Sequence, residues 1–187
     1  IINSSAGGSN CPNASCIISN PPPEAMPISD GVIADWRNDA VAGGTHSGDY
    51  TISGSTQASL GPRKIEGNLN LSNTSILTIT GTLWVTGNIN ISNSSTMRLD
   101  PGSGTNSGVV VSDGTISVSN SAIFQGAGTG SYILLLSARD AKSQTSIFVS
   151  NASTGVIYYA GKSWIQFSNS ATAKEATAWG ITLSNSS

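Results

Sequence analysis

The chain has 187 residues, which suits a single domain, and its composition is polar without being charged. Only 10% of its residues are charged and the net charge is −2, which argues against the strongly charged composition of disordered proteins. Its eight Lys and Arg residues are scattered singly, so nucleic acid is not an expected partner, and no apolar run approaches the roughly 18–20 residues of a membrane span.

Residues 1–28 show no regular periodicity and are rich in proline. Proline has no backbone N–H and favours an extended path outside a sheet. Both cysteines of the chain, Cys11 and Cys16, lie in this segment and are close enough to close a small loop. A disulfide is the expected interpretation in an exported protein, and the single histidine of the chain disfavours a metal site. We expect an extended N-terminal segment that contains this loop.

Residues 29–66 are predicted to supply a capping helix and the entry strands. Ser29 is a suitable N-cap, and Gly43-Gly44 would end the helix after about Ala42. Four residues make one apolar stripe at helical spacing: Ile33, Trp36, Ala40 and Val41. We expect the helix to cover the first open turn of the next region, with Ile33 and Trp36 as the cap.

Residues 67–187 repeat a short phrase: an aliphatic residue, a spacer, an apolar residue and then Ser-Asn. The Asn residues of its six copies are Asn73, Asn93, Asn120, Asn151, Asn169 and Asn185. They lie 20, 27, 31, 18 and 16 positions apart, so a strand and its corner recur while the connections vary in length. Polar and apolar residues alternate before each corner, as in half-buried strands. This pattern is typical of a solenoid.

Asn is well suited to the corner of a solenoid. It tolerates the left-handed backbone conformation, and its amide can both donate and accept a hydrogen bond. Amides stacked at one corner can therefore bond in a ladder; the alternative is that Asn serves only as a common turn residue. The predicted fold is all-β, a right-handed parallel β-helix (β-solenoid) with one short N-terminal capping helix.

A β-solenoid leaves unpaired backbone groups at its two ends, and these groups can pair with another chain. Two N-terminal segments resemble broken copies of the repeat, Ile1-Ile2-Asn3-Ser4-Ser5 and Ile17-Ile18-Ser19-Asn20. One hypothesis is that the N-terminal segment of one protomer docks on the last turn of the next. Such a head-to-tail contact would propagate into a fibre.

Two sets of residues are candidates for contact with sugars. The first set consists of Asn residues in Asn-X-Ser/Thr sequons, which are possible acceptors of N-linked glycans: Asn3, Asn13, Asn70, Asn90, Asn151 and Asn185. The alternative is that a chain rich in Asn and Ser forms sequons by chance. Alternation also turns three aromatic residues outward: Trp84, Phe148 and Trp164. Three interpretations are open for these residues: coverage by the helix or the loops, lateral packing against other protomers, or stacking on glycans.

Catalysis is not expected. Carbohydrate lyases and hydrolases often use parallel β-helices, but their sites need clustered carboxylates or a basic group with a perturbed pKa. After Gly67 the acids are dispersed over expected turns: Asp100, Asp113, Asp140 and Glu175. We predict neither catalytic residues nor a cofactor or metal, and a degenerate polysaccharide lyase is the third choice of function.

Several motifs resemble a family of secreted surface proteins of uncultivated small-genome bacteria that are often labelled pilus-assembly proteins. They include the segment from Pro21 to Asp30, Trp36, Gly61-Pro62-Arg63-Lys64-Ile65 and Gly81-Thr82-Leu83-Trp84-Val85-Thr86-Gly87-Asn88. The resemblance runs from about Cys11 to the end of the chain. It implies a pilus-related β-solenoid at the cell surface, for which no catalytic residues are known.

The sequence thus predicts a structural subunit of an extracellular fibre or pilus-like appendage. Its partner would be itself, head-to-tail through open solenoid ends, with other pilus components or surface glycans as further partners. The alternative is a monomeric cell-surface adhesin or pilus-tip module that binds glycans through its outward aromatic residues.

Overall fold

The protein is described by a computed structural model, which covers residues 25–151 and 156–184 with one α-helix followed by parallel strands. The elements are α1 (Asp30–Ala42), β1 (Thr45–Ser47), β2 (Tyr50–Ile52), β3 (Gln57–Leu60), β4 (Arg63–Glu66), β5 (Leu69–Leu71), β6 (Ile76–Ile79), β7 (Leu83–Val85), β8 (Ile89–Ile91), β9 (Thr96–Leu99), the 3-10 turn η1 (Pro101–Ser103), β10 (Gly108–Ser112), β11 (Ile116–Val118), β12 (Ile123–Gln125), β13 (Ile133–Ser137), β14 (Thr145–Ser150), β15 (Val156–Ser168) and β16 (Glu175–Ser184).

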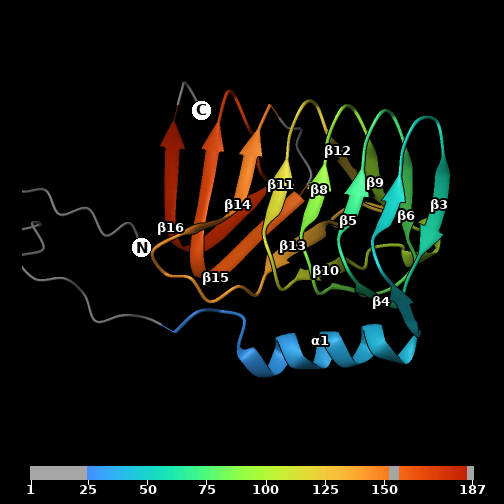
Figure 1. The fold of residues 1–187 in the computed structure, drawn as a ribbon, viewed down its shortest axis with the longest axis horizontal. Coiled ribbons are helices and arrows are strands. Elements are labelled where there is room, and N and C mark those ends of the chain that lie inside the picture. The colour runs from blue at the N-terminus through green and yellow to red at the C-terminus, as the bar shows by residue number, and fades with distance from the viewer. Residues whose placement is uncertain (1–24, 152–155, 185–187) are drawn as a thin grey trace, which may run out of the picture.

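The strands stack in three columns, and every described pairing is parallel (Figure 1). The first column contains β1, β4, β7, β10 and β13, the second β2, β5, β8, β11 and β14, and the third β3, β6, β9 and β12. The long strands β15 and β16 run through the first column and then the second. They join the two columns into one twelve-stranded sheet that folds back on itself.

The core lies between the columns and is built by alternation along each strand. In β5, β7, β8 and β11 the first and third residues are buried and the middle one points outward. Residues in register have the same chemistry at successive levels: Leu69 pairs with Ile89, and Ile89 with Ile116. Burial of such aliphatic side chains, about 1.5–3 kcal/mol each, is the main stabilising term of the fold.

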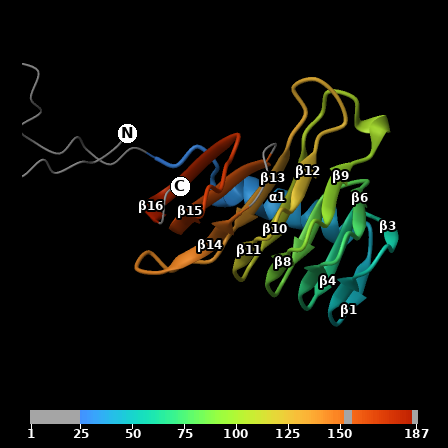
Figure 2. The ribbon, with the colours of Figure 1, turned by 90° about the horizontal axis from the view of Figure 1, so that it is seen from above.

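The regular part begins earlier than the predicted boundary at Gly67. Strands β1, β2 and β3 pair in register with β4, β5 and β6, so residues 45–66 belong to the same columns as the rest. The sequence obscured this first level because few of its residues are aliphatic, as in the Thr-His-Ser of β1. Residues 100–107 connect β9 to β10 and residues 138–144 connect β13 to β14, and the first of these connections projects from the columns (Figure 2).

Helix α1 has the predicted bounds. The Ser29 Oγ accepts a hydrogen bond from the Val32 N–H at 3.3 Å, and the helix ends before Gly43. The apolar stripe is shorter than predicted, because Ile33 and Ala40 are buried whereas Val41 is 44% exposed.

The helix does not cover the first open turn, which corrects the expected role of Ile33 and Trp36 as a cap. It lies along the outer face of the first column, against β4, β7 and β10 (Figure 1). Ile33 packs in a cluster with Val111, Leu136 and Tyr159, and Trp36 packs against that cluster. The physical reason is that β10 and β13 contain unbroken apolar runs, which must be buried on both faces.

A pair of Gly→Ala substitutions tests the close stacking of the corners. A Cβ at Gly87 would lie 2.6 Å from Asn68 Oδ1 and 2.7 Å from the Gly67 carbonyl oxygen, so Gly87→Ala should destabilise by about 1–3 kcal/mol. The matched control is Gly31→Ala on α1, where the nearest atom would be 3.7 Å away. That change should stabilise the protein by about 0.5–1 kcal/mol. Urea unfolding measures both, and equal effects would contradict the stacking.

Candidate functional site: corner ladders, an uncovered end and a cavity

The Asn residues of the repeat occupy the corner at which the chain leaves the second column. The described members all have left-handed backbones, with φ between 46° and 56°; they are Asn73, Asn93, Asn120, Asn151 and Asn169. The Asn93 Nδ2 donates to Asn73 Oδ1 at 3.3 Å, and the Asn120 Nδ2 donates to Asn93 Oδ1 at 3.1 Å. These bonds form the predicted ladder over three of its six residues. Asn185 lies outside the described residues.

Backbone hydrogen bonds reinforce the same corner. The Thr74 N–H donates to the Asn93 carbonyl at 3.0 Å, and the Ser94 N–H donates to the Asn120 carbonyl at 2.9 Å. Asn93 and Asn120 therefore each join neighbouring levels through both the side chain and the main chain. The left-handed conformation is what points these groups along the column, and Asn adopts it at low cost.

Two substitutions at Asn93 separate its roles. Asn93→Leu loses both amide bonds and places a branched side chain at φ 56°, so it should destabilise by about 2–3 kcal/mol. Asn93→Gly loses the same bonds but accepts the backbone conformation, so it should cost about 1 kcal/mol less. Denaturant unfolding measures both variants. If Asn93→Leu were as stable as the wild type, the ladder would not contribute to the stability of the fold.

A second ladder, not predicted from the sequence, runs along the corner between the first and second columns. The Asp49 Oδ1 accepts from the Asn68 N–H at 2.7 Å and from its Nδ2 at 3.0 Å. The Asn68 Oδ1 accepts from the Asn88 N–H at 2.8 Å, and the Asn88 Oδ1 from the Thr115 N–H at 2.8 Å. A signal was present: each of these four residues follows a glycine. At Gly67, Gly87 and Gly114 the glycine is needed because a Cβ would collide with the level below, and Gly48 has a positive φ of 86°.

Asp49 differs from its stacked neighbours because it can be charged. The two hydrogen bonds from Asn68 lower the pKa of Asp49, the bond from the backbone N–H contributing most. A carboxyl group with a lowered native pKa contributes stability above its unfolded pKa, and loses it as the pH falls through the native value. Protonation of Asp49 in acid therefore weakens the attachment of the first level of the columns to the second level.

The acid sensitivity of this corner is testable by unfolding between pH 6 and pH 2. The wild type should lose stability below about pH 4 more steeply than Asp49→Asn, because the amide keeps an acceptor for Asn68 that does not titrate. Asp39→Asn on the exposed face of α1 is the control and should follow the wild type. Parallel curves for all three proteins would exclude Asp49 as the source.

The predicted glycan acceptors fall into two groups. Asn70 and Asn90 point outward on the second column, where the Asn90 Nδ2 donates to Asn70 Oδ1 at 2.9 Å and the Asn70 Nδ2 donates to Thr51 Oγ1 at 3.3 Å. These amides thus stabilise the stacking of three levels. Asn151 is exposed at the corner. The remaining acceptors, Asn3, Asn13 and Asn185, lie outside the described residues. Cys11 and Cys16 lie outside them as well.

The three outward aromatic residues have different environments. Trp84 lies under α1, where the Arg37 guanidinium carbon and the Lys64 Nζ are 5.5 and 4.8 Å from its ring centroid. Its Nε1 donates to Asp113 Oδ2 at 2.9 Å. Trp164 is half-buried, and its Nε1 donates to the Lys142 carbonyl at 2.7 Å. Phe148 alone among the three is exposed, at 41%. Trp84 therefore packs against the helix, and Trp164 is bonded to the loop after β13.

The last strand, β16, presents core residues to solvent. Ile181 and Leu183 are 45% and 66% exposed, whereas their register partners on β15, Ile165 and Phe167, are buried. No described strand pairs with the outer edge of β16. The strand contains neither Lys nor Pro and only one charged residue, Glu175. It therefore lacks the charged and proline residues that protect an edge from association.

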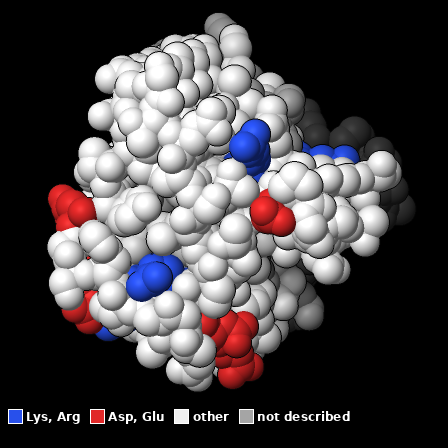
Figure 3. Space-filling model, turned by 90° about the vertical axis from the view of Figure 1, so that its right-hand side faces the viewer, with Lys and Arg blue, Asp and Glu red and all other residues white. Residues whose placement is uncertain are grey.

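The opposite end is polar but carries little charge. Strands β1, β2 and β3 contain no Lys, Arg, Asp or Glu, and Figure 3 shows charged side chains only as separate spots on this end. Its core is already covered, because Ile52 and Leu60 are buried. The two ends thus differ: one exposes inward-facing apolar residues, and the other exposes mainly backbone edges.

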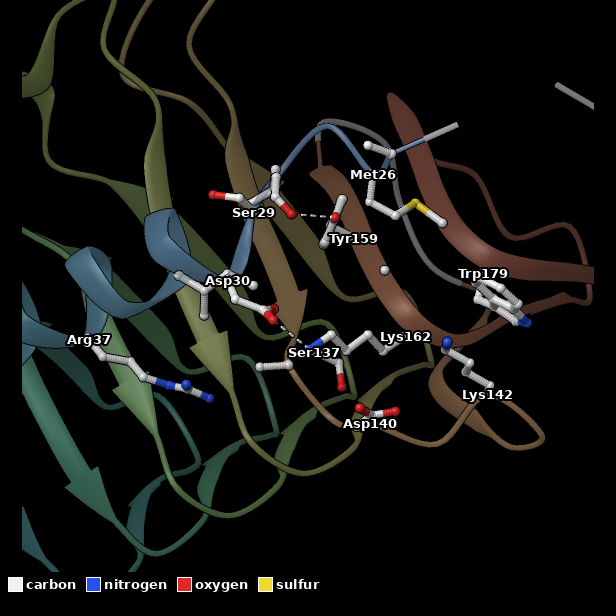
Figure 4. Close-up of a pocket in the computed structure, with 15 residues that line it drawn as sticks. Met26, Ser29, Asp30, Arg37, Ser137, Asp140, Lys142, Tyr159, Lys162 and Trp179 are labelled. Carbon is white, nitrogen blue, oxygen red and sulfur yellow. Dashed lines mark hydrogen bonds and ion pairs between the residues drawn. The ribbon is translucent and has the colours of Figure 1, made fainter. Parts of the chain in front are cut away.

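A cavity of about 690 Å³ lies beside β16, between the start of α1, the loop after β13 and β15 (Figure 4). Lys162 Nζ forms an ion pair with Asp30 Oδ2 at 2.8 Å, and this bond raises the pKa of Lys162. The Tyr159 hydroxyl donates to the Ile28 carbonyl at 2.9 Å, and burial raises the pKa of Tyr159. These contacts fix the chain before the helix on the first column.

The outer part of the cavity is amphipathic. Trp179 is 49% exposed and lies on the same side as Met26 (Figure 4). The Lys142 Nζ is 4.4 Å from the centroid of the Trp179 ring. Sequence reasoning missed this site because it joins residues 25–30 with residues more than a hundred positions away. The cations of the cavity are held by carboxylates or an aromatic ring, since Lys162 pairs with Asp30 and Lys142 lies over Trp179.

Comparisons with protein-family models, with curated proteins and with solved structures all return no match. Within residues 25–151 and 156–184, no cluster of three or more His, Cys, Asp or Glu side chains could hold a metal. The one described α-helix is too short and too polar to cross a bilayer. The geometry of the ends and corners is therefore the main basis for a functional proposal.

Proposed function

We propose that the chain is a right-handed β-solenoid that serves as the structural subunit of an extracellular fibre or pilus-like appendage. The three columns are its three faces, and the right hand is the one that nearly all parallel strand crossovers adopt. The function is assembly, head-to-tail through the open ends of the solenoid. The observation that carries the proposal is β16, with its exposed core residues and its unpaired edge.

A second copy fits this edge in register. Continuing the second column past β16 would place Tyr50 of the next copy on Ile181, and Ile52 on Leu183. Both pairs are apolar and inward-facing, like every pair below them in this column. The intervening pair, Thr51 on Thr182, would be polar and outward-facing. A joint of this kind repeats the stacking inside the subunit and is heterologous, so it propagates without closing.

Secretion and the cell surface complete the proposal. The resemblance to pilus-assembly surface proteins supports this location, as does the low charge of a chain stabilised by hydroxyl and amide groups. In that setting a Cys11–Cys16 disulfide and glycans at the predicted acceptors would form. Other components of the pilus are further proposed partners.

A monomeric adhesin or pilus-tip module is the second candidate, and the exposed ring of Phe148 favours it. An aromatic face on a polar surface can stack on a sugar ring. Trp84 and Trp164 contribute less, because the first packs beneath α1 and the second is half-buried. Phe148→Ala should then weaken glycan retention without changing the association state, which separates this candidate from the fibre.

Electron microscopy of the native protein over a concentration series tests the fibre. We expect uniform fibres from the wild type and none from Leu183→Asp, because that change places a charge at the centre of the joint. Ser117→Asp adds the same charge to an outward-facing position of the second column, away from the ends, and should leave the fibres unchanged. Dispersed wild-type particles at every concentration, or fibres from Leu183→Asp, would contradict the proposal.

A further inference from the structure

Arg63 is a charged residue in an otherwise apolar, inward-facing row of the first column. It pairs in register with Leu83, and Leu83 with Val110, and both of these residues are fully buried. At the first level this row falls on Gly44, which has no side chain. The Arg63 guanidinium lies there instead, since its Nη1 would be 3.3 Å from a Cβ at Gly44. A cation therefore stands at the uncovered first level, where the row ends.

The guanidinium of Arg63 has no counter-charge within residues 25–151 and 156–184. The ion pairs of this part of the chain involve other cations: Arg37, Lys64 and Lys162. The Arg63 Nε is buried and makes no hydrogen bond. A buried donor without an acceptor costs free energy, and the cost is larger for a charged group. A carboxylate brought to the first level from outside would remove this cost.

Glu175 is the complementary residue at the other end of the columns. It is the only charged residue of β16, it is exposed, and its carboxylate has no ion-pair partner in the described part of the chain. Continuing the first column past β16 would place Gly43 of a second copy on Glu175, and Gly44 on Ala176. The guanidinium beside Gly44 would then lie one level, about 4.8 Å, above the start of β16.

We propose that Glu175 of one copy forms an ion pair with Arg63 of the next, and that this pair fixes the register and direction of the joint. The proposal rests on the proposed function, in which a second copy stacks on β16. Head-to-tail stacking brings the two residues together because they lie at opposite ends of the columns. A pair of Arg and a carboxylate can be bidentate, which adds geometric specificity. A joint in a shifted register would bury the two charges apart from each other, which is strongly unfavourable.

Charge reversal tests the pair, with fibre formation measured by sedimentation over a concentration series. Glu175→Arg should raise the concentration needed for fibres roughly a hundredfold, because it brings two cations together in the joint. Arg63→Glu should have a similar effect, because it brings two carboxylates together. An equimolar mixture of these variants should form fibres near the wild-type concentration, since every joint of an alternating fibre pairs opposite charges. Asp35→Arg on the exposed face of α1 is the matched control and should assemble like the wild type.

Glu175→Arg decides the proposal even if Arg63→Glu does not fold, because Glu175 is exposed and its replacement leaves the interior of the columns unaltered. Fibres from Glu175→Arg at the wild-type concentration would overturn the ion pair. A mixture of the two folded variants that assembles no better than either one alone would also overturn it. In both cases the fibre itself stands, because the wild type still assembles and Leu183→Asp tests the joint separately. If the wild type forms no fibres at any concentration, the proposed function and the ion pair both fail.

Discussion

The structure depends on turning the same corner at every level. A parallel column is stable only if each strand returns in register with the one before, since a slip of one residue would move the buried set to the solvent face. The left-handed Asn residues and the Asp49, Asn68, Asn88 and Thr115 ladder fix two corners, and the register of all three faces follows. The connections are then free to vary, and stacked residues lie 19, 20 or 27 positions apart.

Much of this arrangement could be predicted from residues alone. The Ser-Asn phrase and the alternation before it identify the second column, because period two and a left-handed corner are local properties that short peptides encode. The helix bounds follow from Ser29 and Gly43 for the same reason. The Gly-Asn and Gly-Asp pairs of the second ladder are equally local, but they recur in fewer copies and are not conspicuous in the sequence.

Other features required distances that a sequence does not contain. The position of α1 depends on the outer face of β10 and β13, where Val111 and Leu136 need a cover, and nothing local distinguishes that face from an open end. The exposure of Ile181 and Leu183 was hidden too, because their phrase is identical in kind to the buried copies. Alternation shows which residues point inward; it does not show which level is uncovered.

Helix α1 crosses several levels of the first column, and its N-terminal end is linked to β15 through Asp30 and Lys162, which are 132 positions apart in the chain. Levels of stacked parallel strands otherwise contact only their neighbours, so they can separate one at a time under load. A helix packed across β4, β7 and β10 and tied to β15 makes those levels yield together, because a pull along the columns loads the helix interface in shear. The helix therefore couples the mechanical strength of several levels of the first column.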